Sequence, residues 1–381
     1  MILRVTAASV HRFCRCLVSQ QTLWGMIQMF RNRARSFALV CLLVLMIYSS
    51  FQVIYMPVEM NVCPDPVRGK DFYGQSEDNI TIVTMYLNLG THSKTSFFLF
   101  SRQRYATHQY KLWLLSWGKL QNKVVAFFDD DEFIKLFRNI RSHLPESYTI
   151  IVKIDKNQLS AFHQKDRIED ILVNPSFTTS YPAEYTCTMN AKYDILDMAL
   201  KQGLIKSKYM AWMDIGLWRK MQEDDPPYTL KIPPDFNSSK IGFSEVTPRR
   251  WLSDLSPREI YEQNIVWVAG GFVLGTKEVV AEFIISYQKT SKILLDQGLA
   301  DTDQQVITSM YSPDMAGNQK VEIMTYACPR GSFGLFGYSY LYFCLPYICR
   351  ASAECKSRQL VNFLGGDLTF ETFQKMHLAN T

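Results

Sequence analysis

From residue 80 onward, short apolar runs typical of buried strands alternate with segments whose apolar residues recur at helical spacing. Strands are predicted at 80–87, 123–128, 148–154 and 209–217. Helices are predicted at 101–117, at 132–140, and over a segment that contains Met189, Tyr193, Leu196 and Leu200 and ends at Gly203. Strands that alternate with helices pair in parallel, and the helices cover both faces of the sheet. The pattern therefore predicts an α/β fold with a mostly parallel central sheet flanked by helices.

The second half of this domain resumes the pattern after a polar interruption. Residues 219–240 are dense in Pro, Asp and Ser, which indicates an exposed loop that can order over a ligand. A strand at 241–246, an apolar run at 265–274 and a helix from 277 to about 295, ended by Gly298, follow. The uncharged aromatic block at 331–349 has the length of a membrane span, but glycine, proline and cysteine residues interrupt it, which favours buried strands and turns.

An uncharged apolar segment at 37–56 precedes the domain and is long enough to cross a bilayer. Three arginines lie directly before it and acidic residues follow it, so the N-terminus is expected in the cytosol. A cleaved signal peptide is the alternative, but the segment is long and ends in bulky residues rather than a small-residue cleavage site. We expect a cytosolic basic tail at 1–36, a transmembrane signal-anchor helix at 37–56, a stem at 57–79 and a lumenal domain at 80–381.

The charge and the cysteines agree with this topology. All of the excess positive charge lies in the tail, which has six arginines and no acid, whereas the rest of the chain is close to neutral. A nucleic-acid partner is therefore not expected, because it would require a basic face. Six cysteines follow the membrane segment and could form up to three disulfides in an oxidising lumen, with fifteen pairings open; free buried thiols are the alternative. Sequons begin at Asn79 and Asn237, as in a glycoprotein.

Acidic residues that follow predicted strands are the first candidates for a site, because ligands bind beyond the carboxyl ends of the strands in open α/β sheets. Three places qualify, at 129–131, at Asp214 and at 301–305. The first group, which includes Asp129, can instead cap the helix that follows it. Asp301 with Gln304 fits a capping box, which leaves Asp303 unexplained.

Asp214 is the most informative of these acids, because it interrupts an apolar strand just before a loop. A carboxylate there needs a metal, a basic partner or backbone amides, and Gly216 would let a bulky ligand approach the backbone; a structural acceptor is the alternative. Mg²⁺ or Mn²⁺ at one carboxylate can neutralise the pyrophosphate that leaves a nucleotide-sugar donor. Lys192 could assist the phosphates, although a lysine on a helix is more often solvated.

Gly270 and Gly271 interrupt an apolar strand, which indicates that something packs closely against the backbone, either a sugar ring or the protein itself. The histidines lack the HExxH spacing of zinc proteases, and there is no Gly-rich P-loop and no GxSxG elbow. Zinc proteases of that type, P-loop kinases or ATPases, and common serine hydrolases are therefore disfavoured.

Seven segments in this order resemble the HtrL/YibB family over about residues 80 to 312: ITIVTMYLNLG, VVAFFDDDEF, TIIVKID, AKYDILDMAL, YMAWMDIGLWR, VWVAGGFVLGT and DTDQQVI. The family is known first from bacterial lipopolysaccharide gene clusters and is similar to glycosyltransferases of the GT-A type. The resemblance implies a GT-A-like, Rossmann-like fold, with a nucleotide-sugar half at 80–218, a loop excursion at 219–240 and an acceptor half at 241–381.

The resemblance also implies roles for single residues. Asp214 would stand where other GT-A enzymes place Asp-x-Asp, at the metal and sugar-nucleotide position, with Gly216 in place of the second acid. Asp129 or Asp303 could supply the missing oxygen, or basic residues could replace the metal. Asp303 and Gln304 would face the donor sugar or the acceptor, with Gly270 and Gly271 nearby. The expected site thus has Asp303 and Gln304 as catalytic residues, with the donor bound by Asp129, Lys192, Asp214, Gly216, Gly270 and Gly271 and the metal by Asp214.

We therefore expect a Golgi-resident type II membrane glycosyltransferase that uses a nucleotide-sugar donor, a glycan, protein or lipid acceptor, and a divalent cation. A non-catalytic lumenal module that binds a glycan or a protein is the alternative, and a surface receptor is a third. Calorimetry with nucleotide sugars distinguishes the first two.

Overall fold

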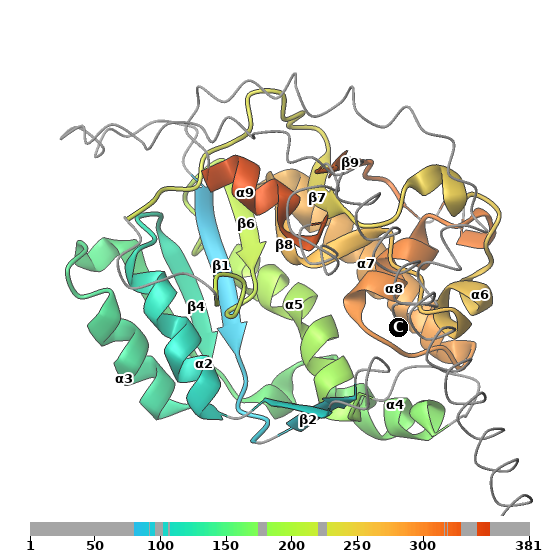
Figure 1. The fold of residues 1–381 in the computed structure, drawn as a ribbon, viewed down its shortest axis with the longest axis horizontal. Helices are drawn as coiled ribbons and strands as arrows, with labels where there is room; N and C mark the ends of the chain where they lie inside the picture. Colours follow the sequence, from blue (N-terminus) through green and yellow to red (C-terminus); the bar gives the residue numbers. More distant parts are fainter. Residues whose placement is uncertain are drawn as a thin grey trace, which may run out of the picture. The chain divides into compact units, whose positions relative to one another are not determined.

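The computed structural model describes residues 80–90, 92–95, 102–105, 107–173, 181–219, 227–315, 317, 319–328 and 341–350, which belong to one compact unit of the chain (Figure 1). The predicted tail at 1–36, membrane helix at 37–56 and stem at 57–79 lie outside the described residues. Within the described part of the chain, none of the helices combines the length and the hydropathy that a membrane span requires.

A seven-stranded sheet forms the centre of the domain, in the order β5-β4-β1-β6-β8-β7-β9. Its strands are β1 (Ile80–Tyr86), β4 (Val124–Phe128), β5 (Thr149–Lys153), β6 (Tyr209–Met213), β7 (Ile241–Glu245), β8 (Val268–Thr276) and β9 (Ile323–Tyr326). β8 runs antiparallel to both of its neighbours, and the other four neighbouring pairs are parallel. A separate antiparallel pair consists of β2 (His92–Thr95) and β3 (Arg102–Tyr105). The predicted α/β fold with a mostly parallel sheet is confirmed.

Helices cover both faces of the sheet, because successive side chains of the buried strands point to opposite faces. The face that receives Met210 and Trp212 is covered by α4 (Lys165–Leu172), α5 (Ala183–Lys201), α6 (Pro257–Glu262), α7 (Lys277–Asp296) and α8 (Asp303–Met310). The face that receives Tyr209, Ala211 and Met213 is covered by α2 (Thr107–Leu114), α3 (Asp131–Ile140) and α9 (Cys344–Arg350). Short 3₁₀ helices occupy Leu115–Gly118, Glu146–Tyr148, Lys156–Gln158, Phe162–Gln164, Arg249–Trp251 and Pro313–Met315.

Two predicted elements differ from the structure. The segment at 101–117 is not one helix, because Arg102–Tyr105 pairs with His92–Thr95 as a strand before α2 begins. Part of the block at 331–349 forms α9, where we expected strands and turns. Its Pro346 lies in the first helical turn, where a missing N–H breaks no intrahelical bond. Four elements, β2, β9, α4 and α6, were not predicted. For the other predicted elements the differences are shifts of their ends, the largest being the end of β6 at Met213.

Both alternatives that the sequence left open for the cysteines, disulfides and free buried thiols, are found in the structure. Cys328 and Cys344 form a disulfide that ties the segment after β9 to the start of α9. Cys187 and Cys349 are buried free thiols, so the upper bound of three disulfides is not reached. Cys63 and Cys355 lie outside the described residues.

Arg141, at the end of α3, is buried and donates several hydrogen bonds, so we expect its substitution to cause a large loss of stability. Its guanidinium donates to the carbonyls of Trp117, Leu120, Asn122 and Tyr148 and to the hydroxyl of Thr149. Burial lowers its pKa to about 10. Arg141→Met leaves several carbonyls without a donor, and each costs about 1–3 kcal/mol. We therefore expect the free energy of unfolding in urea to fall by about 3–5 kcal/mol.

The matched control is Arg138→Met, on the exposed side of the same helix. It should change the free energy of unfolding by less than about 0.5 kcal/mol. Equal effects of the two substitutions would show that the buried hydrogen bonds do not stabilise the fold.

Candidate functional site

Three neighbouring strands end in polar residues at one edge of the sheet. β1, β4 and β6 are parallel, and they are followed by Asn88, Asp129 and Asp214. From β1 the sheet extends outward to β4 and β5, and the chain then returns to place β6 on the other side of β1. Ligands of open α/β sheets bind at such a reversal, outside the carboxyl ends of the strands. The edge that carries Asp214 is thus the candidate site.

Asp214 lies on the face of the sheet that α5 covers. Trp212, two residues earlier, packs into the core on that face, and side chains two apart on a strand point the same way. The indole Nε1 of Trp212 donates to Asp214 Oδ1 at 2.7 Å. The backbone N–H of Asp214 donates to the carbonyl of Gly271 on β8 at 2.9 Å. These two bonds fix the position at which the carboxylate leaves β6.

The residues after Asp214 are held from the other face by two tryptophans. Trp117 Nε1 donates to the carbonyl of Ile215 at 2.9 Å. A Cβ added at Gly216 would lie 2.7 Å from the ring of Trp113, so the glycine makes room for that indole. The space predicted to admit a bulky ligand is therefore filled by the protein, and a role of Gly216 in donor binding stays a prediction.

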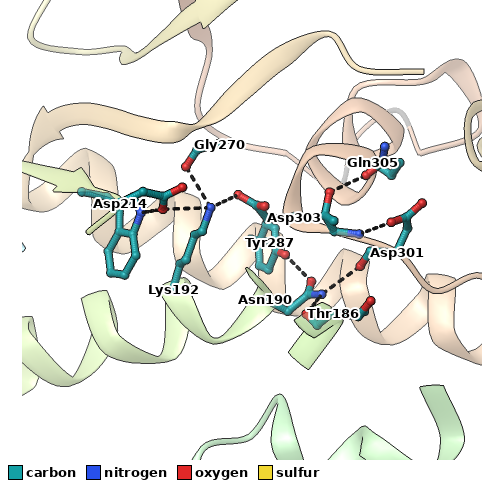
Figure 2. Close-up of polar contacts among 11 residues, drawn as sticks. Thr186, Asn190, Lys192, Asp214, Gly270, Tyr287, Asp301, Asp303 and Gln305 are labelled. Atoms are coloured by element: carbon teal, nitrogen blue, oxygen red, sulfur yellow. Dashed lines mark hydrogen bonds and ion pairs between the residues drawn. The ribbon is translucent and has the colours of Figure 1, made fainter. Parts of the chain in front are cut away.

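Lys192 on α5 joins two of the predicted acids in a buried cluster (Figure 2). Its Nζ lies 3.2 Å from Asp214 Oδ1, 3.1 Å from Asp303 Oδ2 and 3.0 Å from the carbonyl oxygen of Gly270. The three acceptors match the three N–H bonds of an ammonium. The exposed fraction is 3% for the Lys192 side chain, 0% for Asp303 and 35% for Asp214. The alternative that Lys192 is a solvated residue on the helix surface is wrong, because it faces the core between α5 and the sheet.

Lys192 and the two carboxylates favour one another's charged forms, whereas the two carboxylates oppose each other. Burial opposes the charge of Lys192, but the two carboxylates outweigh it and raise the lysine pKa. Burial raises the pKa of Asp303 despite the nearby ammonium, and Asp214 raises it further. With all three groups ionised, the cluster carries one net negative charge, and its one partly exposed member is Asp214. The net negative charge of the cluster is therefore accessible to solvent at Asp214.

The Asp303 carboxylate leaves no room for a side chain at Gly270, whereas Gly271 packs most closely against Leu217. A Cβ at Gly270 would lie 2.1 Å from Asp303 Oδ2, a distance that real contacts do not show. A Cβ at Gly271 would lie 3.2 Å from the Leu217 side chain and 3.5 Å from Asp214 Oδ2. Of the two explanations offered by the sequence, close packing of the protein accounts for Gly270; sugar contact at either glycine stays a prediction.

Gly270→Ala should accordingly disrupt the cluster. The added methyl must displace the Asp303 carboxylate, which has no exposed surface to move into and is bonded to Lys192. We expect a loss of about 2–4 kcal/mol in the free energy of unfolding, in the range of overpacking combined with a weakened buried ion pair. Urea titrations of Gly270→Ala and Gly271→Ala measure this loss. The free energy of unfolding should fall distinctly less in Gly271→Ala than in Gly270→Ala. The reverse order would contradict this geometry.

A second set of hydrogen bonds holds the loop that carries Asp303 (Figure 2). Asn190 on α5 donates to the carbonyl of Asp301 at 2.9 Å and accepts from the hydroxyl of Tyr287 on α7 at 2.5 Å. Asp301 Oδ1 accepts from the N–H of Thr302, which precedes α8 as its N-cap. The Thr302 hydroxyl bonds to Gln305, so the predicted capping box of Asp301 with Gln304 is wrong. The helix begins at Asp303 itself.

Two predicted site residues stand apart from the Lys192 cluster. Asp129 accepts from the backbone N–H of Asn88 at 2.9 and 3.1 Å, and burial raises its pKa. Asp130 beside it caps α3, as the structural alternative for this acidic run expected. The amide oxygen of Gln304 is buried and has no hydrogen-bond partner among the described residues. The roles proposed for Asp129 and Gln304 stay predictions.

Within the described ranges, no three His, Cys, Asp or Glu side chains are grouped closely enough to hold a metal ion. Asp214 Oδ1 is shared by Lys192 and Trp212, while no bond to Oδ2 is found in the described part of the chain. Mg²⁺ or Mn²⁺ commonly binds one or two protein carboxylates and takes its other ligands from substrate phosphates and water. The residues therefore fit a cation that arrives with a phosphorylated ligand.

Sequence reasoning missed the residues that position the cluster. Trp212 was visible as the first residue of a Trp-x-Asp pattern, and its spacing from Asp214 places both on one face. Asn190 and Tyr287 gave no signal, because they meet across two helices that are far apart in sequence. Only the packing of α5 against α7 brings them together.

Comparison with known proteins gives one family and several distant similarities. A family model described as a bacterial protein of unknown function, HtrL_YibB, matches residues 78–317. Protein HtrL of Escherichia coli (strain K12) is 24% identical over 257 residues, which cover 63% of this chain and 87% of that protein.

Among solved structures, the chain is similar to mouse xyloside xylosyltransferase 1 in its apo form and to the mannosyltransferase Ktr4p of S. cerevisiae. For the first, the TM-score is 0.34 at 11% identity, covering 70% of this chain and 93% of that one. For the second, the TM-score is 0.33 at 11% identity, covering 61% and 65%.

Proposed function

The chain belongs to the HtrL_YibB family, whose function is unknown, and we propose from its site that the domain is a glycosyltransferase that takes a sugar from a nucleotide-sugar donor. The acceptor would be a glycan, a protein or a lipid. One observation carries the proposal: the partly exposed Asp214 carboxylate, backed by buried Lys192 and Asp303, lies at the strand reversal of the sheet. A charged group held in place there can act on a ligand without rearrangement.

The net charge of the cluster supports a requirement for a cation. A donor diphosphate is negative, and so is the exposed end of the cluster at Asp214. The two repel each other unless a divalent ion lies between them. Asp214 would hold this ion, which when bound supplies positive charge to the departing pyrophosphate. Asp129 is held by Asn88 and is not needed for this arrangement.

Lys192 and Asp303 act behind Asp214 in this proposal. Lys192 fixes the Asp214 carboxylate through its ammonium, and its positive charge would act on the phosphates from behind Asp214 and not by contact, because its side chain is only 3% exposed. Asp214 and Asp303 together keep that lysine charged although it is buried. Because the Asp303 carboxylate is fully buried, proton transfer from an acceptor to it would require the residue to become exposed. The amide oxygen of Gln304 has no partner among the described residues, but it is also buried, so Gln304 would likewise have to move to contact a sugar.

We further propose that the enzyme is a single-pass type II membrane protein of the Golgi, anchored through residues 37–56. The uncharged segment and the arginines before it support this orientation. The Cys328–Cys344 disulfide is compatible with an oxidising lumen, as is the exposed sequon at Asn237. A fusion with a reporter at the C-terminus tests this orientation. We expect the reporter to be protected from protease in sealed microsomes, and its digestion would show the opposite orientation.

A second function is favoured by Gly216. That residue stands where GT-A enzymes are expected to have a second acid, and Trp113 fills its space. A domain that has lost one metal ligand could retain the cleft as a binding site for a glycan or a protein without catalysis.

Calorimetry of the full-length chain with a panel of nucleotide sugars separates these functions. The transferase predicts that one donor binds with Mn²⁺ or Mg²⁺ and binds much more weakly when the ion is chelated. The binding module predicts that no donor binds under either condition. A donor affinity that does not change when the ion is chelated would contradict the proposal that a divalent ion must lie between the negative cluster and the diphosphate.

A further inference from the structure

Arg219 is an exposed arginine in the turn that follows Asp214. We propose that its guanidinium contacts the diphosphate of the donor and supplies the positive charge that buried Lys192 does not bring to the phosphates by contact. This inference rests on the proposed transferase function and adds a residue to its donor site. The turn that carries Arg219, the tryptophan beside it and the charges around Asp214 support the contact.

Two consecutive turns keep Arg219 near the edge of the sheet where β6 ends. The N–H of Leu217 donates to the carbonyl of Asp214 at 2.9 Å, and the N–H of Arg219 donates to the carbonyl of Gly216 at 3.3 Å. A turn of this kind holds Cα atoms three residues apart within about 7 Å of each other. The backbone of Arg219 therefore lies at the same edge of the sheet as Asp214.

Asp214 and Arg219 approach this edge from opposite faces of the sheet. The Asp214 carboxylate lies on the face that α5 covers and accepts from Trp212 there. The Arg219 guanidinium lies over the ring of Trp113, 5.7 Å from its centroid, and Trp113 packs against Gly216 from the face that α2 covers. A diphosphate that lies across the edge would thus meet the ion at Asp214 on one side and Arg219 on the other.

Trp113 gives the guanidinium a defined position before any ligand binds. Arginine stacks on aromatic rings, and its planar group still presents N–H donors that match the oxygens of a phosphate. A side chain that is already held loses less conformational freedom when it binds a ligand. Gly216 contributes indirectly, because it makes room for the indole on which Arg219 lies.

The charge of Arg219 is available to an anionic ligand. Its guanidinium has no carboxylate within ion-pair distance among the residues that the structure describes. Two lysines at the same edge of the sheet differ from it, because they pair with acids at the start of α3. Lys111 lies 2.5 Å from Glu132, and Lys153 lies 2.8 Å from Asp131.

With Arg219 included, the charges of the Lys192 cluster, the ion and the diphosphate cancel. A divalent ion offsets the diphosphate of a nucleotide sugar, which leaves the single net negative charge of the cluster. The Arg219 guanidinium offsets that charge. Asp129 and Asp130, which follow β4 at this edge, are held by the backbone N–H groups of Asn88 and of the first turn of α3. When the diphosphate departs, a guanidinium beside it also stabilises the charge that develops.

Calorimetry of the full-length chain with UDP, GDP, ADP and dTDP, each with Mn²⁺, tests the contact. These probes contain the diphosphate and lack the sugar. We expect at least one of them to bind the wild type, and Arg219→Gln to weaken that binding by about tenfold or more. Because salt screens an exposed charge, the difference between the wild type and the variant should narrow as the NaCl concentration rises.

Two further variants separate the charge of Arg219 from its packing. Arg219→Lys keeps the charge without the planar group, so its affinity should lie between those of the wild type and Arg219→Gln. Arg138→Gln, at an exposed arginine in the last turn of α3, is the matched control and should bind as the wild type does. Thermal unfolding shows which variants fold, and Arg219→Lys keeps the comparison usable if Arg219→Gln does not.

Three results would overturn this proposal and leave the transferase function standing. They are wild-type affinity in Arg219→Gln, an equal loss in Arg138→Gln, and a loss in Arg219→Gln that stays constant with salt, which would indicate packing on Trp113 alone. A wild type that binds none of the four diphosphates with Mn²⁺ would overturn the proposed function as well.

Discussion

Replacing Asp214 by asparagine is expected to abolish sugar transfer and to weaken donor binding in the presence of Mn²⁺ by about 100-fold, the equivalent of about 2.7 kcal/mol. Asparagine keeps the shape of the side chain and its bond from Trp212, but it removes the charge that would hold the cation. Calorimetry with the donor identified for the wild type gives the loss in affinity, and a transfer assay gives the loss in rate.

The protein should remain folded in this variant. Asp214 is partly exposed, and Lys192 keeps its ion pair with Asp303 after the substitution. Asp131→Asn is the control, since Asp131 is an exposed aspartate paired with Lys153 and should have no effect on transfer. A variant that retains full transfer activity would show that Asp214 does not act on the donor.

Replacing Lys192 by methionine is expected to lower the free energy of unfolding by about 3–5 kcal/mol. The substitution leaves the fully buried Asp303 carboxylate without its cation, and no exposed surface is available to it. Lys201→Met, at the exposed end of the same helix, should change the stability by less than about 0.5 kcal/mol. Urea titrations of both variants measure the difference.

The pH dependence distinguishes an unpaired charge from a simple packing defect. Burial already raises the pKa of Asp303, and removing Lys192 takes away the main group that lowers it. A carboxyl group whose pKa is raised in the folded state contributes stability below its ordinary pKa and loses that contribution as the pH rises through the folded pKa. The deficit of Lys192→Met should therefore shrink on acidification from neutral pH. Adding Asp303→Asn should restore part of the stability at neutral pH.

A deficit in Lys192→Met that is constant with pH, or a double variant less stable than the single one, would contradict the buried ion pair. Either result would indicate that the stem of the lysine side chain stabilises the fold by packing alone.

β1, β4 and β6 could be predicted because each is a short apolar run buried on both faces. The position of Asp214 directly after a predicted strand then placed it at the carboxyl edge, and the Gly270–Gly271 pair indicated a close contact. Neither inference needed a long-range contact. β3 could not be predicted, because its pairing with β2 is what makes it a strand.

The burial of Lys192 could not be predicted from the sequence for a related reason. Local composition cannot distinguish a lysine that points to solvent from one that meets two carboxylates of distant segments. The same holds for Asp303, whose partners lie on α5 and β8. Its neighbour Thr302 is the N-cap of α8 in place of the expected Asp301, whose carbonyl accepts from Asn190.

The central claim is that the diphosphate of a sugar nucleotide binds at Asp214 through a divalent ion. A crystal structure of the chain with a nonhydrolysable donor analogue and Mn²⁺ tests it directly, because the anomalous signal locates the ion. We expect the ion to be coordinated by Asp214 and by the diphosphate oxygens, with Lys192 still bonded to Asp214 and Asp303. A donor bound at another edge of the sheet, or an ion that does not touch Asp214, would contradict the account.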